Sequence, residues 1–246
     1  MKIKTQIFEN IEPLPNINDI ICVLEKNQHH LKNVLRIKNG EIIKIIINEE
    51  FEAIGKIVET EKALSYKIMD INKISNKTNL NITICFAICK SGQNELVAEK
   101  LTELGVKNIY FWVSKHTSYK VAKFSDKLER LEKIIEGASR QSKQTFIPRC
   151  KIYNSLNELL RIIDIRNDIA LYCSLASKRQ KIKDLRFNKD IKNIYIFIGP
   201  EGDFSKDEYE ALGKMQNAIP ITLGDSILKS ETAAIVATSQ LIGMLL

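Results

Sequence analysis

The sequence predicts an α/β protein with a mainly parallel sheet, preceded by a small β-rich part. After residue 80, apolar runs of strand length alternate with helical patterns, which is typical of a parallel sheet covered by helices. These runs are continuously apolar, as expected for strands buried on both faces. With 246 residues, 44% of them hydrophobic, the chain can form one large domain or two small ones.

The N-terminal part combines one helical pattern with several β-type runs. His29 to Leu35 favours a short helix, and Asn39-Gly40 is a strong turn signal. Short charged turns separate three predicted strands, at residues 42–47, 51–58 and 65–70. Asn72 to Asn79 is rich in Asn, Lys and Ser and predicts a linker. We therefore expect a first domain over residues 1–72 and a second over residues 73–246.

The second part repeats a strand-then-helix order. Its predicted strands cover residues 82–88, 109–113, 169–173, 194–198 and 219–223. Apolar residues recur at helical spacing over residues 93–104, where Gly105 ends the helix, and over residues 125–139. Capping-box patterns at Ser155–Glu158 and Ser205–Glu208 predict two more helix starts. A last helix is expected over residues 231–246, with Ser230 as its N-cap.

Two glycine-bearing turns stand where a predicted strand passes into a helix. The first lies in residues 195–205, around Gly199 and Gly202, and the second in residues 219–232, around Gly224. Open α/β sheets bind ligands at the carboxyl ends of their strands, and glycine lets the main chain approach a ligand closely. The turns therefore predict a small-molecule site built largely from backbone.

Several familiar site classes find no support in the sequence. There is no Walker A loop, no G-x-G-x-x-G turn and no G-x-S-x-G elbow. The chain has 3 histidines, and its 5 cysteines form no CxxC pair, so we expect no metal site and no disulfide framework. Cys85, Cys89 and Cys173 lie in apolar runs and predict buried thiols. No signal peptide or membrane-length apolar run is present, so we expect a cytoplasmic protein without a membrane partner.

Positive charge is concentrated in the second part. The net charge is +7, and residues 71–246 hold 27 Lys and Arg against 19 Asp and Glu, whereas residues 1–70 hold 10 against 11. A basic surface favours an acidic partner, most commonly nucleic acid. A solvated, solubilising surface is the alternative that charge alone leaves open.

The two glycine turns carry a family resemblance. Ile198-Gly-Pro-Glu-Gly202, followed by Leu223-Gly-Asp-Ser-Ile-Leu-Lys-Ser-Glu-Thr-Ala233, resembles the RsmE family, the ribosomal small-subunit (16S) RNA uridine-N3 methyltransferases of the SPOUT superfamily. Residues 29–36, 99–105 and 136–142 match further family segments in the same order. The resemblance therefore covers nearly the whole chain.

The resemblance implies an architecture, a cofactor and partners. It implies a PUA-like β-barrel that binds RNA, followed by a trefoil-knotted α/β domain. Three loops of the knot would hold S-adenosylmethionine, and the protein would be a homodimer acting on small-subunit ribosomal RNA, within the assembled subunit. The implied cofactor residues are Leu171, Tyr172, Cys173, Ile198, Gly199, Pro200, Glu201, Gly202, Leu223, Gly224, Ile227 and Leu228. For the leucines and isoleucines, ordinary core packing is the alternative reading.

Methyl transfer from S-adenosylmethionine requires little covalent catalysis by the protein. The sulfonium is already activated, so alignment of the nucleophile is the main task. Uridine N3 must also lose its proton, and a nearby cation would stabilise the anion. The candidate cations are Lys229, Arg140, Lys4 and the sulfonium itself. Glu201 could accept a proton or orient loops, and Glu231 could favour the start of the last helix.

The chain departs from the family pattern around these candidates. Ser226 and Lys229 stand where the family usually has arginine, Ser230 where it has threonine, and Asp203 where it has glycine. Lys229 keeps the charge but lacks the planar fork of a guanidinium, and Ser226 loses the charge. Anion stabilisation is therefore expected to come partly from elsewhere.

A basic stretch is the predicted RNA contact. It comprises Lys115, Lys120, Lys123, Arg140, Lys143 and Arg149, with Tyr119 nearby. Such side chains would bind phosphates, although a solvated helix face is the alternative for any single lysine. His116 could also face RNA, but an exposed loop histidine is the favoured interpretation. Two other functions stay open: methylation of another RNA, at a ribose hydroxyl or in tRNA, and a non-catalytic role in ribosome assembly, which the loss of arginine at Ser226 favours.

Overall fold

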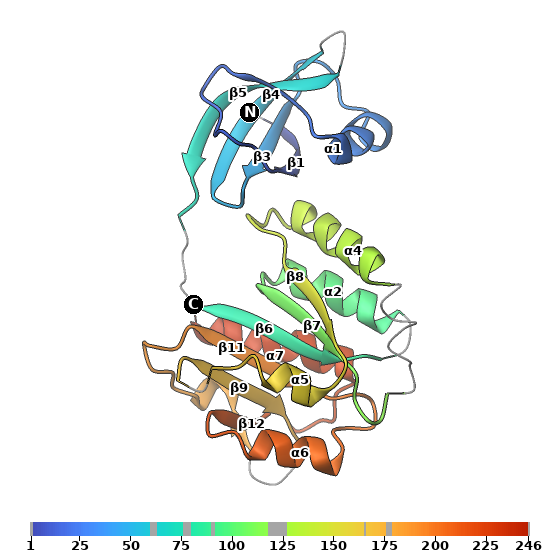
Figure 1. The fold of residues 1–246 in the computed structure, drawn as a ribbon, viewed down its shortest axis with the longest axis vertical. Coiled ribbons are helices and arrows are strands. Elements are labelled where there is room, and N and C mark those ends of the chain that lie inside the picture. Colours follow the sequence, from blue (N-terminus) through green and yellow to red (C-terminus); the bar gives the residue numbers. More distant parts are fainter. Residues whose placement is uncertain are drawn as a thin grey trace. The chain divides into compact units, whose positions relative to one another are not determined.

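A computed structural model describes residues 2–59, 63–75, 80–89, 92–117, 127–164, 166–175 and 179–245. The chain divides into two compact units (Figure 1). The first comprises Met1–Lys77 together with Ser139–Phe146, and the second comprises Thr78–Ala138 and Ile147–Leu246. Helix α4 (Leu128–Gln141) therefore contributes residues to both units.

The first unit is a five-stranded sheet in the order β1-β3-β4-β5-β2. The strands are β1 (Ile3–Glu9), β2 (Ile20–Cys22), β3 (Ile42–Ile47), β4 (Phe51–Glu59) and β5 (Leu64–Lys73). β1 runs parallel to β3, and the other pairs are antiparallel. The three predicted strands are confirmed, as is a helix, formed by α1 (Glu25–His29) and the π-helical turn η1 (His30–Val34).

Strands β1 and β2 were missed by the sequence patterns. Lys4, Thr5 and Gln6 interrupt the apolar pattern of β1. β2 pairs over only 3 residues of the apolar run at residues 20–24, which was not interpreted as a strand. The expected linker began too early, because Asn72 and Lys73 still pair with Glu52 and Phe51 of β4. Residues 76–79 of that segment lie outside the described residues.

Polar contacts tie residues 139–146 to the first unit. Arg140 Nη2 donates to Asn27 Oδ1 at 2.8 Å, and Gln6 Nε2 donates to the Gln144 carbonyl at 2.6 Å. Asn27 is buried and donates in turn to Glu9 Oε1 at 2.6 Å. Burial of its carboxyl raises the pKa of Glu9 above the ordinary value. Arg140, Asn27 and Glu9 therefore form one connected polar network, which the sequence did not reveal.

The second unit is built on a seven-stranded sheet in the order β10-β12-β9-β11-β6-β7-β8. Every pair in it is parallel. The five predicted strands are confirmed as β6 (Asn81–Ala87), β7 (Asn108–Trp112), β9 (Asp168–Cys173), β11 (Asn193–Ile198) and β12 (Ala218–Thr222). The edge strands β8 (Arg149–Tyr153) and β10 (Gln180–Lys181) were not predicted. β8 has no continuous apolar run, because Arg149 and Lys151 interrupt it, and β10 consists of 2 polar residues.

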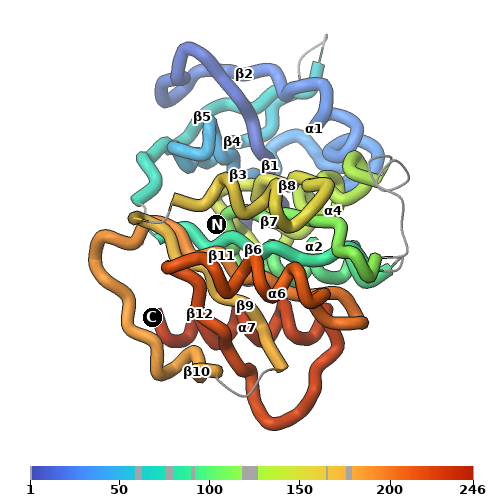
Figure 2. The backbone as a smooth tube through the Cα atoms, turned by 60° about the horizontal axis from the view of Figure 1, so that its bottom comes forward, coloured from blue at the N-terminus to red at the C-terminus, as the bar shows by residue number. Residues whose placement is uncertain are grey.

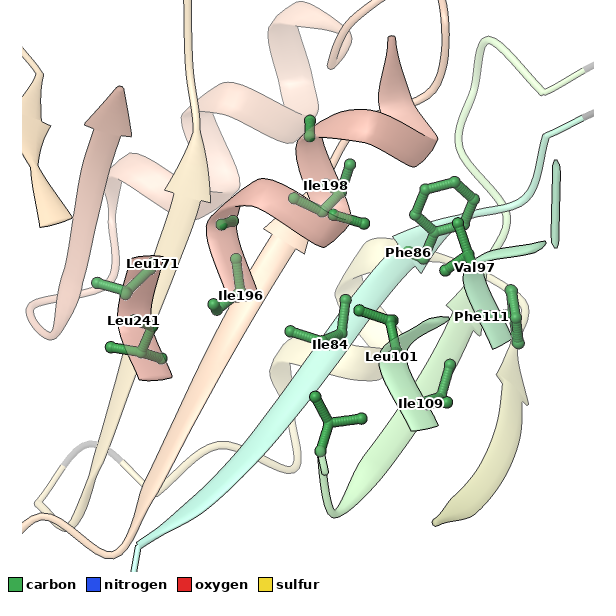
Figure 3. Close-up of a cluster of buried hydrophobic side chains, with 14 of the residues drawn as sticks. Ile84, Phe86, Val97, Leu101, Ile109, Phe111, Leu171, Ile196, Ile198 and Leu241 are labelled. Carbon is green, nitrogen blue, oxygen red and sulfur yellow. The ribbon is translucent and has the colours of Figure 1, made fainter. Parts of the chain in front are cut away.

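Helices cover both faces of this sheet. On one face, α2 (Gln93–Glu103) and α7 (Ser230–Leu245) pack on alternate strand residues such as Ile84 and Ile196, as Figure 3 shows. On the other face, α5 (Leu156–Leu160) and α6 (Lys206–Gly213) pack on Cys85 and Phe197. A short 3-10 turn, η2 (Ile182–Asp184), follows β10. The predicted doubly covered parallel sheet is confirmed.

The helix starts differ in detail from the predictions. Ser205 and Glu208 form the full capping box of α6. At α5, Ser155 Oγ accepts from Glu158 N at 3.2 Å, but the Glu158 carboxylate accepts from Asn154 N at 2.7 Å, outside the box pattern. Ser230 is the first residue of α7 and not its N-cap, because the Lys229 carbonyl accepts from Ala233 N at 2.8 Å.

Two further predictions are resolved at the level of single residues. α4 starts at Leu128, and the expected first residues 125 and 126 of this helix lie outside the described range. The thiols of Cys85 and Cys89 are buried as expected, whereas Cys173 is only half-buried.

In the described part of the chain, we find no helix whose length and apolar character would let it cross a membrane.

Candidate functional site

A cavity of about 300 Å³ opens at the carboxyl ends of β9, β11 and β12. These strands are neighbours in the sheet, in the order β12-β9-β11, and lie side by side in Figure 2. The loops that follow them form the walls, so segments far apart in sequence meet at one edge. α7 also begins here, since Lys229 and Ser230 line the cavity.

Most of the predicted cofactor residues line this cavity. They are Cys173, Ile198, Gly199, Pro200, Glu201, Leu223, Gly224, Ile227 and Leu228. Leu171 is instead fully buried in the core, and Tyr172 is packed on the opposite face of the sheet, with its ring centroid 6.3 Å from that of Tyr209. Successive strand residues point to opposite faces, which explains this split. Gly202 lies against the side chain of His116.

The turn after β11 leaves no room for a side chain at Gly199. A Cβ there would lie 3.2 Å from two ring carbons of Phe204 and 3.3 Å from its backbone nitrogen. Phe204 is itself held in place, because its buried ring stacks on Trp112 with the centroids 5.9 Å apart. The glycine therefore lets the main chain come close to a packed aromatic ring.

Asp203 occupies a left-handed backbone conformation in the same turn, with φ of 63°. Its carboxylate accepts from the Tyr209 hydroxyl at 3.0 and 2.8 Å and from Phe204 N at 2.8 Å. Aspartate tolerates this region better than most residues because its short side chain can bond locally. These hydrogen bonds offset the backbone cost and place a negative charge at the cavity wall.

The loop after β12 presents aliphatic groups to the cavity. Leu223 and Leu228 are half-buried at the margin of the core, whereas Ile227 is 81% exposed. The backbone of the loop is held by Gln240 Nε2, which donates to the Leu223 carbonyl at 3.1 Å. An exposed isoleucine beside two anchored leucines makes an apolar surface that can pack against a flat ring.

Charged groups of both signs line the cavity. Glu201, which accepts from Gln93 Nε2 at 3.2 Å, lies there with Asp203. Lys229 and Arg179 supply the positive charge, and Arg179 Nη1 donates to the Ser174 carbonyl at 3.2 Å. Sequence reasoning missed Arg179, because no motif marks it and only the position of β10 brings it to this edge.

The other predicted cations have contacts in the first unit. Arg140 is bound to Asn27, as described above, and Lys4 Nζ lies 3.2 Å from Glu41 Oε1.

Of the predicted RNA contacts, Lys115 pairs with Asp207, and this hydrogen bond raises the pKa of Lys115. Arg149 and Lys143 are exposed. Tyr119, Lys120 and Lys123 lie outside the described residues.

Comparison with known proteins bears on both units. Residues 76–242 match the model of an RNA methyltransferase domain, and residues 24–68 match that of an RNA methyltransferase PUA domain. Ribosomal RNA small subunit methyltransferase E of Buchnera aphidicola is 30% identical over 244 residues, covering 94% of this chain and 90% of the relative.

Solved structures share the fold. A methyltransferase from Legionella pneumophila, in complex with the bound cofactor SAM, superposes with a TM-score of 0.84 at 24% identity, covering 99% of this chain and 98% of that one. Ribosomal RNA small subunit methyltransferase E from Neisseria gonorrhoeae, bound to S-adenosyl methionine, gives a TM-score of 0.83 at 23% identity, covering 96% and 97%. With both domains matched and a relative aligned along nearly its full length, the chain belongs to the RNA methyltransferase family that includes ribosomal RNA small subunit methyltransferase E.

Proposed function

We propose that the protein transfers a methyl group from S-adenosylmethionine to N3 of a uridine in small-subunit ribosomal RNA. One observation carries the proposal: a chain aligned along nearly its whole length with a ribosomal RNA small subunit methyltransferase forms a cavity from three loops at adjacent strand ends. Loops in this position are the usual ligand site of an open α/β sheet.

The residues present fit this cofactor. The apolar surface of Leu223, Ile227 and Leu228 suits an adenine ring, and the main chain at Gly199 can approach closely. The carboxylates of Glu201 and Asp203 complement the positive charges of a sulfonium and an ammonium group. Arg179 and Lys229 complement a carboxylate or a nucleobase anion.

Each charged residue then has a specific proposed role. When bound, the cofactor supplies the activated methyl group, so the protein has to align the nucleophile and stabilise the uridine anion. We assign anion stabilisation to Lys229, with Arg179 as the second cation at the cavity. Glu201 is held by Gln93, which supports a role in orienting the loop or in accepting the N3 proton.

Arg140 and the first unit are assigned to RNA binding. The guanidinium of Arg140 is bound to Asn27 within the first unit, and the matching PUA domain model is that of an RNA methyltransferase. Arg140 would thus act by shaping an RNA-binding surface. We place the first domain at residues 1–73, one residue beyond the expected boundary so that it includes all of β5, and extend it by the 139–146 segment.

We further propose a knotted second domain in a cytoplasmic homodimer that acts on the assembled small subunit. The path of α7 supports the knot, because this helix follows β12 but packs on β11, β6 and α2, across the middle of the sheet. A knot would bring the turns after β11 and β12 together at the cavity. The dimer and the assembled-subunit substrate follow from the family resemblance.

The decisive experiment uses unmodified small ribosomal subunits and methyl-labelled S-adenosylmethionine, with mass spectrometry of the labelled nucleoside. We expect label in 3-methyluridine with wild type and little label with Lys229→Ala. Label in a ribose-methylated nucleoside would assign the protein another RNA chemistry. Cofactor binding without label would favour the assembly role, which the uncharged Ser226 at the cavity wall also suits.

A further inference from the structure

A buried carboxylate joins two segments behind the cavity. Glu208 is 6% exposed, and its Oε2 accepts from Ser205 N at 2.7 Å, which is the capping contact of α6. The same oxygen accepts from Ser114 Oγ at 3.1 Å, and Oε1 accepts from Lys115 N at 2.9 Å. Ser114 lies 94 residues away in sequence, in the loop that follows β7. One side chain thus holds the start of α6 and the loop after β7.

Further contacts join the same two segments. His116 Nδ1 lies 3.0 Å from the Asp203 carbonyl, and a Cβ at Gly202 would lie 3.6 Å from the His116 side chain. Trp112, the last residue of β7, stacks on Phe204. The turn that carries Gly199 and Glu201 is therefore supported from outside the cavity by residues 112–116.

Capping of a helix does not require such a link. At α5, Ser155 caps the helix and accepts from Glu158 N at 3.2 Å, as Ser205 does at α6. The Glu158 carboxylate, however, accepts from Asn154 N and Nδ2, at 2.7 and 3.1 Å, within its own segment. Glu208 differs because its buried charge depends on donors from a second loop. Separating the loops would leave that carboxylate short of partners, at a high desolvation cost.

We propose that Glu208 is a positioning residue that couples the cofactor loop, residues 199–205, to the loop after β7, so that cofactor binding and RNA binding strengthen each other. The inference rests on the proposed function. Residues 199–203 carry walls of the cofactor cavity. Lys115, which is exposed and pairs with Asp207 of α6, is one of the side chains predicted to contact RNA phosphates. Because Glu208 holds the two loops together, a ligand that orders one loop lowers the cost of ordering the other. Linkage makes the effect reciprocal.

The test measures the coupling itself. The affinity for S-adenosylhomocysteine, which binds without turnover, is measured by calorimetry with and without saturating unmodified small ribosomal subunits. For wild type we expect the subunits to tighten binding by about 5-fold or more. Glu208→Gln places an amide donor against either Lys115 N or Ser205 N. For this variant we therefore expect the ratio of the two affinities, with subunits over without subunits, to fall close to one. Glu158→Gln, the matched capping variant, should keep the wild-type ratio.

A purely structural role for Glu208 would weaken folding or binding but leave the ratio at the wild-type value, and this result would overturn the inference. A wild-type ratio of one would do the same. Failure of wild type to bind the cofactor would instead remove the proposed function and the inference with it. If Glu208→Gln does not fold, by circular dichroism, Ser114→Ala replaces it. This variant removes the hydroxyl that donates to Glu208, together with its contact to His116 N in the same loop, and leaves the Ser205–Glu208 cap in place. Its ratio should fall by about 2-fold or more, and an unchanged ratio refutes the coupling.

Discussion

Replacement of Gly199 by alanine should weaken cofactor binding, because the added methyl group would collide with a packed aromatic ring. The added Cβ would lie 3.2 Å from two ring carbons of Phe204 and 3.3 Å from its backbone nitrogen. These separations are shorter than ordinary van der Waals contact. The ring cannot move aside, because it is 4% exposed, stacked on Trp112 and flanked by Tyr209 at a centroid distance of 5.3 Å. The turn itself has to shift.

The size of the effect follows from overpacking. Forcing an extra carbon into a well-packed site costs about 1–3 kcal/mol. Because Gly199 and its neighbours form a wall of the cavity, we expect much of this cost to appear in binding. If all of it does, the dissociation constant of S-adenosylmethionine rises by about 5- to 150-fold. Isothermal titration calorimetry measures this constant, and urea denaturation measures the part that appears in stability.

Gly213 at the end of α6 is the matched control. A Cβ there would meet nothing within 4 Å, so Gly213→Ala should leave cofactor binding unchanged. It should raise the unfolding free energy by about 0.5–1 kcal/mol, through reduced entropy of the unfolded chain. Wild-type affinity and stability in Gly199→Ala would refute the argument, since it would show that the turn accommodates a side chain.

Three further outcomes are expected. Tyr209→Phe removes both hydroxyl contacts to Asp203, whose backbone is left-handed, and should lower the unfolding free energy by about 1–2 kcal/mol in urea denaturation; an unchanged value would show that the turn is held without them. Arg140→Ala leaves the buried Asn27 oxygen without its charged donor and should lower the unfolding free energy in urea denaturation by about 1.5–3 kcal/mol. An unchanged unfolding free energy would contradict the proposed polar network. Burial raises the pKa of Glu9, so the folded protein binds this proton more tightly than the unfolded chain. The resulting stability is present below pH 4.5 and is lost as pH rises through the raised pKa. Urea denaturation from about pH 4 to about pH 7 should show this fall in wild type and not in Glu9→Gln.

The site was predictable where local chemistry marks it. The turns at Gly199 and Gly224 follow continuous apolar strands, and that combination alone indicated a ligand site at strand ends. Arg179 could not be found in this way, because it stands in a polar segment without a motif. Its place at the cavity depends on the position of β10 beside β12.

Polar networks were even less accessible to sequence reasoning. Ser205–Glu208 reads as a capping box, and the structure confirms it, but nothing near it in sequence points to Ser114. In the same way, Arg140 matched a family segment, while its bond to Asn27 depends on residues 139–146 packing on the first unit. A carboxylate or guanidinium has the same local pattern whichever distant partner it binds.

By itself, the sequence determined the strands with continuous apolar runs, the helix starts with capping chemistry and the glycine turns. These features depend on backbone conformation and on burial of one face, which residues close in sequence control. The tertiary structure alone decided that β12, β9 and β11 are neighbours, that Arg179 lies at the cavity and that Glu208 joins two loops. Hydrogen bonds and packing between distant segments depend on the order of strands in the sheet, and no local pattern encodes that order.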